Sequence, residues 1–370
     1  MGDAHRIGVV GLGVISRAYL DTLAGHPSVR VTAVADLDAA RSASVAAGLP
    51  GATALTVEEL LSSPEVDTVL NLTVPAAHAE IALGAVARGK HVYGEKPLAA
   101  TLDDARAVLE VAAKAGVGVG CAPDTVLGTG IQTARAAVEA GAVGRPLFAT
   151  AVMVTPGHER WHPQPDFYYA PGGGPLLDMG PYYLASLVHL LGPVRSVTGA
   201  SSRLRTERVI GSGPRAGERI PVEVDSHVSG VLEHASGALT TITTSFDGVV
   251  TTAAPIEVHG ETGTLSVPDP NCFDGEVRIF ELGGAQWRTL PPSAGYAEGA
   301  RGVGLLDFIA ADEARGPRAG GDLALHVLET MTALLRSSAE GRRVELTTTA
   351  ASALVPLTTA EQWRDRPAAR

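Results

Sequence analysis

Short apolar runs alternate with helix-forming stretches from the N-terminus to about residue 122. The runs lack a regular apolar–polar alternation, which is typical of parallel strands buried on both faces. They predict strands over 7–10, 29–35, 66–72, 91–93 and 117–120. Between them, residues that favour helices predict helices over 17–24, 39–47, 57–61, 76–87 and 102–115. This order predicts an α/β domain over 1–123, a doubly wound parallel Rossmann sheet with right-handed crossovers.

The pattern changes after Pro123. A helix is predicted over 131–140, an extended run over 147–154, and later helices over 182–191 and 323–338. Between residues 194 and 290 the chain carries repeated β-rich runs separated by turn signals. The clearest of these runs are 222–233, 238–246, 256–259 and 277–280. Residues 124–370 are therefore predicted to form an α+β domain with a large, mostly antiparallel sheet.

Composition narrows the class of protein without naming a reaction. The length of 370 residues suggests about two domains. The residues are 45% hydrophobic and 19% charged, which is the balance of a globular protein. The formal charge of −11 disfavours nucleic acid as a partner, because an acidic surface repels phosphates. No apolar run approaches the ~20 residues of a membrane span, so we expect no membrane association and a cytoplasmic protein. Cys121 and Cys272 belong to no C-x-x-C motif and are expected as buried, reduced thiols.

A glycine-rich turn follows the first predicted strand. The sequence from Gly11 to Ser16 reads G-x-G-x-x-S and opens a helix, with Val14 and Ile15 between the motif positions. Gly11 would permit the tight turn, and Gly13 would let the backbone approach a pyrophosphate at the helix N-terminus. The motif in this βα context predicts a dinucleotide site.

Asp36 ends the second predicted strand, 23 residues after Gly13. A carboxylate there would accept hydrogen bonds from the hydroxyls of an adenosine ribose and repel a 2′-phosphate. We therefore expect NAD as the cofactor. Arg41 on the next helix could accommodate the phosphate of NADP, the less favoured alternative.

Lys96 stands in the segment Gly94-Glu95-Lys96-Pro97, at the C-terminal end of the predicted strand 91–93. Ligands of doubly wound folds bind at this edge of the sheet. An ammonium there would polarise a carbonyl oxygen or stabilise the alkoxide that develops as hydride leaves. The position predicts a catalytic lysine between nicotinamide and substrate.

Taken together, the motifs resemble those of the Gfo/Idh/MocA oxidoreductases, the family of glucose–fructose oxidoreductase and inositol dehydrogenase. The resemblance spans nearly the whole chain. It is carried by Gly11-x-Gly13, Asn71, Pro75, His78, Glu95-Lys96-Pro97, the Gly-rich segment 172–180 that contains Asp178, and Gly192-Pro193.

The resemblance implies roles in the first domain. Lys96 corresponds to the catalytic lysine of the family, and Glu95 corresponds to the residue that supports it. Asn71, Pro75 and His78 match positions that line the nicotinamide side of the cofactor.

In the second domain, Asp178 matches a carboxylate that aligns a substrate hydroxyl or relays a proton. Many members place a histidine four residues later and a second aspartate three residues after that; here Tyr182 and Ala185 occupy those places. Tyrosine also occurs there in glucose–fructose oxidoreductase relatives. A nearby ammonium such as that of Lys96 would lower its pKa, so Tyr182 is predicted to act as the acid/base.

The segment His158-Glu159-Arg160-Trp161-His162 matches the zinc-protease pattern H-E-x-x-H. That pattern needs a helix, whereas prolines lie on both sides of this segment, so we expect a loop and no metal. His158, Trp161 and His162 are instead candidates to contact a polyhydroxylated substrate, as is Asp124 after the last Rossmann strand. A solvent-facing loop is the alternative.

The expected reaction is NAD(P)-dependent hydride transfer with a secondary carbinol of a sugar, glycoside or cyclitol, with Lys96 and Tyr182 at the reacting oxygen. Two alternatives remain open. Some relatives retain NAD and cleave glycosidic bonds through transient oxidation, and a non-catalytic cofactor-binding sensor is the third reading. The resemblance also implies a homodimer or homotetramer formed through an exposed sheet face.

Overall fold

The computed structural model describes residues 4–311, 316–351 and 353–365. The chain divides into two compact units. The first unit comprises Met1–Gln132, Ser293–Leu325 and Ser352–Arg370, and the second comprises Thr133–Pro292 and His326–Ala351. The predicted division at residue 123 therefore differs from these units, because two later segments return to the first unit.

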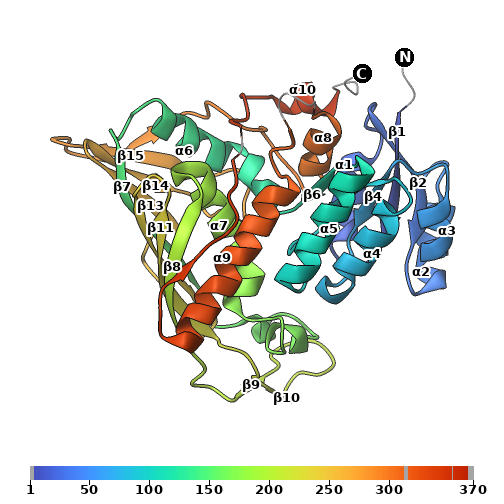
Figure 1. Cartoon of the computed structure of the whole chain (residues 1–370), viewed down its shortest axis with the longest axis horizontal. Helices are drawn as coiled ribbons and strands as arrows, with labels where there is room; N and C mark the ends of the chain where they lie inside the picture. The colour runs from blue at the N-terminus through green and yellow to red at the C-terminus, as the bar shows by residue number, and fades with distance from the viewer. Residues whose placement is uncertain (1–3, 312–315, 352, 366–370) are drawn as a thin grey trace. The chain divides into compact units, whose positions relative to one another are not determined.

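The first unit is built on a six-stranded parallel sheet with the strand order β3-β2-β1-β4-β5-β6. This is the order of a Rossmann dinucleotide-binding fold. The strands are β1 (His5–Val10), β2 (Val29–Ala35), β3 (Thr53–Ala54), β4 (Thr68–Asn71), β5 (His91–Gly94) and β6 (Val119–Cys121). The helices between them are α1 (Ser16–Leu23), α2 (Ala39–Ala47), α3 (Val57–Ser62), α4 (His78–Val86) and α5 (Leu102–Ala115), and the short 3-10 helix η1 (Pro75–Ala77) precedes α4 (Figure 1).

Local capping signals fix several of these helices. The Thr101 side chain accepts the Asp104 N–H at the start of α5, and Gly116 ends that helix with φ 69°. Thr56 and Glu59 form a reciprocal capping box at the start of α3. Such caps satisfy backbone groups that a helix end leaves without partners, which is why sequence patterns locate these boundaries well.

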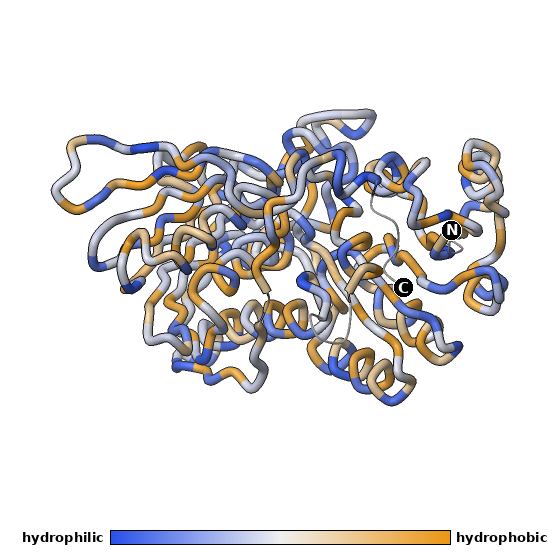
Figure 2. Tube along the Cα trace, turned by 90° about the horizontal axis from the view of Figure 1, so that it is seen from above, coloured by the Kyte–Doolittle hydropathy of each residue, from blue (hydrophilic) through white to orange (hydrophobic). Residues whose placement is uncertain are grey.

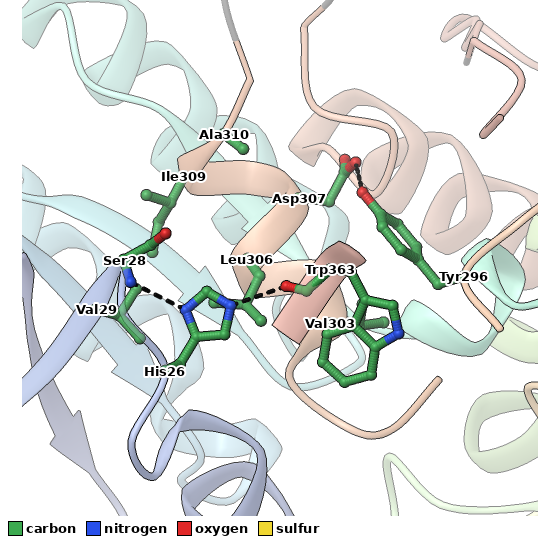
Figure 3. Close-up of a pocket in the computed structure, with 10 residues that line it drawn as sticks. All are labelled: His26, Ser28, Val29, Tyr296, Val303, Leu306, Asp307, Ile309, Ala310 and Trp363. Atoms are coloured by element: carbon green, nitrogen blue, oxygen red, sulfur yellow. Dashed lines mark hydrogen bonds between the residues drawn. The ribbon is translucent and has the colours of Figure 1, made fainter. Parts of the chain in front are cut away.

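The C-terminal segment packs onto the first unit. Helix α10 (Ala360–Arg364) buries Trp363, whose indole N–H donates to the carbonyl of Ala297 at 2.9 Å. The carbonyl of Trp363 lies 2.9 Å from Nε2 of His26, beside helix α8 (Val303–Ile309) and a cavity of about 30 Å³ (Figure 3). Neither α8 nor α10 was predicted from the sequence.

The second unit contains a nine-stranded sheet with the order β16-β15-β14-β13-β7-β12-β11-β8-β17. Every pair is antiparallel except β7 with β12. The strands are β7 (Pro146–Val154), β8 (Val194–Ser202), β11 (His227–His234), β12 (Leu239–Ser245), β13 (Ile256–Gly260), β14 (Gly263–Val267), β15 (Val277–Glu281), β16 (Arg288–Leu290) and β17 (Val344–Glu345). The predicted α/β plus α+β architecture is thus confirmed.

Helices α7 (Pro175–Leu191) and α9 (Gly321–Glu340) lie on one face of this sheet (Figure 1). The backbone of Leu334 on α9 packs so closely on Gly199 of β8 that a Cβ there would lie 2.4 Å from the Leu334 carbonyl oxygen. The remaining helix is α6 (Thr129–Glu139). Residues 203–222 extend from the sheet as a small hairpin of β9 (Glu207–Val209) and β10 (Arg219–Pro221).

Helices of both units carry apolar stretches interrupted by polar ones, as expected for helices with one buried face (Figure 2). Within the described residues, no helix is long and apolar enough to cross a membrane. Cys121 and Cys272 do not form a disulfide. Cys121 is buried, but Cys272 is exposed, so the burial predicted for Cys272 is wrong.

Candidate active site

The turn between β1 and α1 is built around Gly11 and Gly13. Gly11 has φ 91°, and a Cβ there would lie 2.7 Å from the backbone of Leu72 and Thr73. Only glycine fits that position. A Cβ on Gly13 would meet no heavy atom within 4 Å, and the next side chain, Val14, is 97% exposed. The turn therefore presents open backbone at the N-terminus of α1, with Ile15 at the helix start.

Asp36 lies beside this turn at the end of β2. Its carboxylate accepts the N–H of Leu12 at 2.8 Å and the N–H of Asp38 at 2.9 Å, and Arg41 Nη1 lies 3.2 Å from both oxygens. Burial opposes ionisation of Asp36, but these N–H groups and the guanidinium outweigh it and lower its pKa. The group is thus held as a carboxylate next to the glycine turn, where the sequence predicted the ribose partner.

Asn71, the last residue of β4, and His78, the first residue of α4, are both buried. The Asn71 side chain donates to the carbonyl of His78 at 3.0 Å and accepts from the Thr73 hydroxyl at 2.7 Å. The His78 ring nitrogens lie 2.6 Å from the Pro97 carbonyl and 3.0 Å from the Thr73 carbonyl. The structure thus shows these two side chains joining the β4 loop to the Lys96-Pro97 turn, while Pro75 lies exposed on the same loop.

Glu95 and Lys96 follow β5 and are both half-buried. One Glu95 oxygen accepts the hydroxyl of fully buried Tyr19 at 2.8 Å, and the other accepts the backbone N–H of Lys96 at 3.0 Å. Tyr19 belongs to α1, the helix that begins at the glycine turn. Glu95 therefore connects the helix that follows the glycine turn to the segment that carries Lys96. No local sequence pattern indicates this link.

Asp124 lies in the 3-10 helix η2 (Asp124–Leu127) and is fully buried. Its carboxylate accepts the N–H groups of Gly302 and Gly304 at the start of α8, at 2.7 and 3.3 Å, and Arg301 lies 3.4 Å away. Burial raises its pKa, against the pull of Arg301 and these N–H groups. These contacts hold Asp124 against the start of α8, and its contact with substrate stays a prediction.

In the second unit, Asp178 and Tyr182 lie on α7. They are four residues apart and therefore share one face of the helix. The helix begins at Pro175, seven residues before the predicted start, so Asp178 sits in its first turn. The Asp178 side chain is 18% exposed and Tyr182 is 7% exposed. Asp178 is thus accessible at the end of the helix where a carboxylate is most stable.

The loop after β7 carries the other three candidates. His158 Nε2 lies 3.0 Å from an Asp178 oxygen, and its ring packs against Trp161, Tyr168 and Phe246. Trp161 is 60% exposed, and His162 packs edge-on against it. The loop therefore joins Asp178 to an exposed aromatic surface within one unit.

A buried charged cluster, which sequence reasoning missed, lies beneath this loop. Glu159 accepts the hydroxyl of Tyr169, and Arg208 on β9 lies 3.3 Å from Glu159 and 2.5 Å from Asp247. Arg208 is 3% exposed, and its guanidinium lies 5.2 Å from the centre of the Tyr169 ring. The partners are up to 49 positions apart in sequence, so no short motif could have revealed the cluster.

The H-E-x-x-H segment does not form an α-helix. The 3-10 helix η3 covers His158–Arg160 only, and Glu159 is taken up by the buried cluster. Within the described part of the chain, no group of three or more His, Cys, Asp or Glu side chains could hold a metal ion.

Comparison with known protein families decides the class. Residues 5–122 match the oxidoreductase family with an NAD-binding Rossmann fold, and residues 131–266 match the GFO/IDH/MocA C-terminal domain. The chain belongs to the Gfo/Idh/MocA family. The resemblance inferred from Gly11, Lys96 and Asp178 is thereby confirmed.

Curated relatives of this family member act on sugars and cyclitols. The chain is 29% identical to a 1,5-anhydro-D-fructose reductase of Ensifer adhaerens, over 93% of this chain and 99% of the relative. It is 26% identical to an inositol 2-dehydrogenase of Rhizobium meliloti, over 92% and 99%. An NAD-binding oxidoreductase structure from Klebsiella pneumoniae shares the fold, with a TM-score of 0.81 at 24% identity over 94% of this chain and 100% of the other. The protein is therefore an oxidoreductase of a family whose first domain is an NAD-binding Rossmann fold.

Proposed function

We propose that this enzyme transfers hydride between a secondary carbinol of a sugar, glycoside or cyclitol and NAD. The observation that carries the proposal is the link from the glycine turn through Tyr19 and Glu95 to Lys96. This link fixes the lysine segment relative to the dinucleotide turn. A bound nicotinamide would supply the hydride chemistry. The side chains of the protein would bind the cofactor, orient the substrate and transfer the proton.

Within the first unit, Gly11, Gly13, Val14 and Ile15 would hold the pyrophosphate, and Asp36 would hold the adenosine ribose. The lowered pKa of Asp36 keeps its carboxylate ionised, and Arg41 is already paired with it. The carboxylate would therefore repel the negative charge of a 2′-phosphate. This favours NAD over NADP. Asn71, Pro75, His78 and Glu95 would shape the nicotinamide end, with Asn71 and His78 acting through the loop backbones that they hold.

At the reacting oxygen, the Lys96 ammonium would stabilise the alkoxide that develops when hydride leaves the carbinol carbon. Tyr182 would take the hydroxyl proton in oxidation and return it in reduction. Asp178 would align a neighbouring hydroxyl. The exposed indole of Trp161, with His162 beside it, offers the apolar surface on which a sugar ring can stack.

The test is NADH formation with a panel of sugars, glycosides and inositols, followed by Lys96→Ala with the best substrate. We expect kcat to fall about 10²- to 10³-fold, as for the loss of one group that stabilises the transition-state charge. Lys114→Ala is the matched control, because Lys114 is a surface lysine, 72% exposed and paired with Glu110. NADH binding should persist in both variants. Undiminished turnover in Lys96→Ala would refute the assignment.

Two other outcomes distinguish the alternatives. Cleavage of a glycoside without net NADH, by protein that retains NAD through purification, would identify a glycosidase that acts through transient oxidation. Cofactor binding without turnover of any substrate would identify a sensor.

The proposal includes a cytoplasmic homodimer or homotetramer joined through the sheet face that α7 and α9 do not cover. On that face Phe148 of β7 pairs with Leu239 of β12, and the two side chains are 45% and 47% exposed. Light scattering on the purified protein would give the stoichiometry, and a monomer would refute this part.

A further inference from the structure

His158 is held in one orientation by groups from three separate segments of the chain. Its Nε2 is hydrogen-bonded to Asp178 of α7 at 3.0 Å. Its ring centre lies 4.6 Å from that of Tyr168 and 4.6 Å from that of Phe246, and its side chain is only 12% exposed. A side chain so enclosed by rings and bonded to a carboxylate is poorly placed to contact the substrate itself. Its contact with the site runs through Asp178.

The neighbouring residue anchors the loop. The Glu159 side chain belongs to the buried cluster with Tyr169 and Arg208, and its carbonyl accepts the N–H of Gly211 at 2.7 Å. These bonds tie the His158 segment to the hairpin of β9 and β10. The backbone that carries His158 is therefore anchored by hydrogen bonds next to its contact with Asp178.

We propose that His158 is the proton-relay partner of Asp178, a role that rests on the proposed function and deepens it. Each oxidation of a carbinol releases one proton together with the hydride. Imidazole is the side chain that most readily accepts and releases a proton near neutral pH. The Asp178–His158 pair places an imidazole next to the carboxylate that would align the substrate hydroxyl.

In oxidation the C–H electron pair would leave as hydride to a bound nicotinamide, and the substrate O–H bond would break as its proton moves to the Tyr182 oxygen. Tyr182 lies one turn from Asp178 on the same face of α7. The phenol proton of Tyr182 would move in the same step by way of the Asp178 carboxylate to Nε2 of His158. Tyr182 ends as a neutral phenol, and an imidazolium–carboxylate pair remains until solvent removes the proton. Reduction reverses each transfer.

Asp178 contacts His158 as a charged group, and the ring of Trp161 packs against the imidazole from the same loop. From η4 (Asp166–Tyr168) it meets the uncharged phenol of Tyr168, and after β12 it meets Phe246. The nearby charges are already paired among themselves: Glu159 with Arg208, and Arg208 with Asp247. A pH effect on the relay should therefore disappear when Asp178 or His158 is changed.

The experiment compares wild-type protein with His158→Asn and His158→Ala, using NAD⁺ and a sugar that wild-type oxidises. We expect kcat to fall about 10²-fold, the usual contribution of a proton-transfer group, with KM within about twofold. The decline of kcat toward acidic pH should vanish in both variants. Free imidazole should restore part of the turnover of His158→Ala. The matched control is His227→Asn, a histidine at the start of β11 that bonds to Ser229 and should leave all values unchanged.

Unchanged kcat in both variants, or a rise in KM alone, would overturn the relay and return His158 to substrate binding. If a variant loses turnover with a lowered melting temperature and no rescue by imidazole, His158 is structural and the relay is likewise overturned. A wild-type protein without hydride transfer to any substrate would instead refute the proposed function, and the relay with it.

Discussion

Arg208 offers a direct measure of what the buried cluster contributes to stability. Its side chain is 2% exposed and is paired with Glu159, 7% exposed, and Asp247, 23% exposed. Arg208→Met keeps the apolar stem but leaves the Glu159 charge in the interior without its cation. Breaking a buried ion pair by removing one partner costs about 3–5 kcal/mol, so we expect a loss of that size in the free energy of unfolding.

Arg205→Met is the matched control, because Arg205 pairs with the same Asp247 at 3.7 Å but is 58% exposed. An exposed pair contributes about 0–1 kcal/mol, since water screens it in both states. Urea unfolding followed by tryptophan fluorescence gives both values, and an unchanged m-value shows that the midpoints are comparable. The double variant Arg208→Met/Glu159→Gln should lose less free energy of unfolding than the sum of the losses in the two single variants. The reason is that Glu159→Gln removes the charge that Arg208→Met leaves unpaired.

If Arg208→Met lies within about 1 kcal/mol of Arg205→Met, the cluster is worth no more than a surface pair. The cluster would then not brace the His158 loop.

Two further predictions concern the glycine turn and a buried histidine. Gly11→Ala should destabilise the protein by about 1–3 kcal/mol, because φ is 91° and the new Cβ would meet backbone at 2.7 Å. Gly13→Ala should leave the melting temperature unchanged but weaken NADH binding in a fluorescence titration; equal effects of the two variants would contradict this account. Burial lowers the pKa of His326 to about 4, so the unfolded chain takes up a proton below about pH 6.5 before the folded one does. The free energy of unfolding should therefore fall by up to about 3 kcal/mol from pH 6.5 to 4, and His326→Gln should show a smaller fall in urea midpoints.

Much of the first unit follows from local signals. The predicted bounds of 29–35, 39–47 and 102–115 coincide with β2, α2 and α5. Side chains that cap their own helix, Asp38 for α2 and Thr101 for α5, mark these limits in the sequence itself. The glycine turn and Asp36 were found for the same reason, because their spacing is set within one βα unit.

The elements of the second unit were predicted less accurately from the sequence. The start of α7 was placed at residue 182, but the helix begins at Pro175 and continues through Pro181. A proline inside a helix argues against it locally, and here burial of almost every later side chain of α7 outweighs that cost. The hairpin of β9 and β10 has little apolar pattern and was missed.

What the sequence by itself determined was the two-part architecture, the family, the dinucleotide turn and the identity of Lys96, Asp178 and Tyr182 as candidates. These depend on periodicity and on motifs whose members lie within a few residues of one another. Only the tertiary structure decided that Tyr19 reaches Glu95, that Asp124 binds α8, and that His158 meets Asp178 above a buried arginine. Such contacts join residues from different elements, and their partners are chosen by how those elements pack, which no short stretch of sequence records.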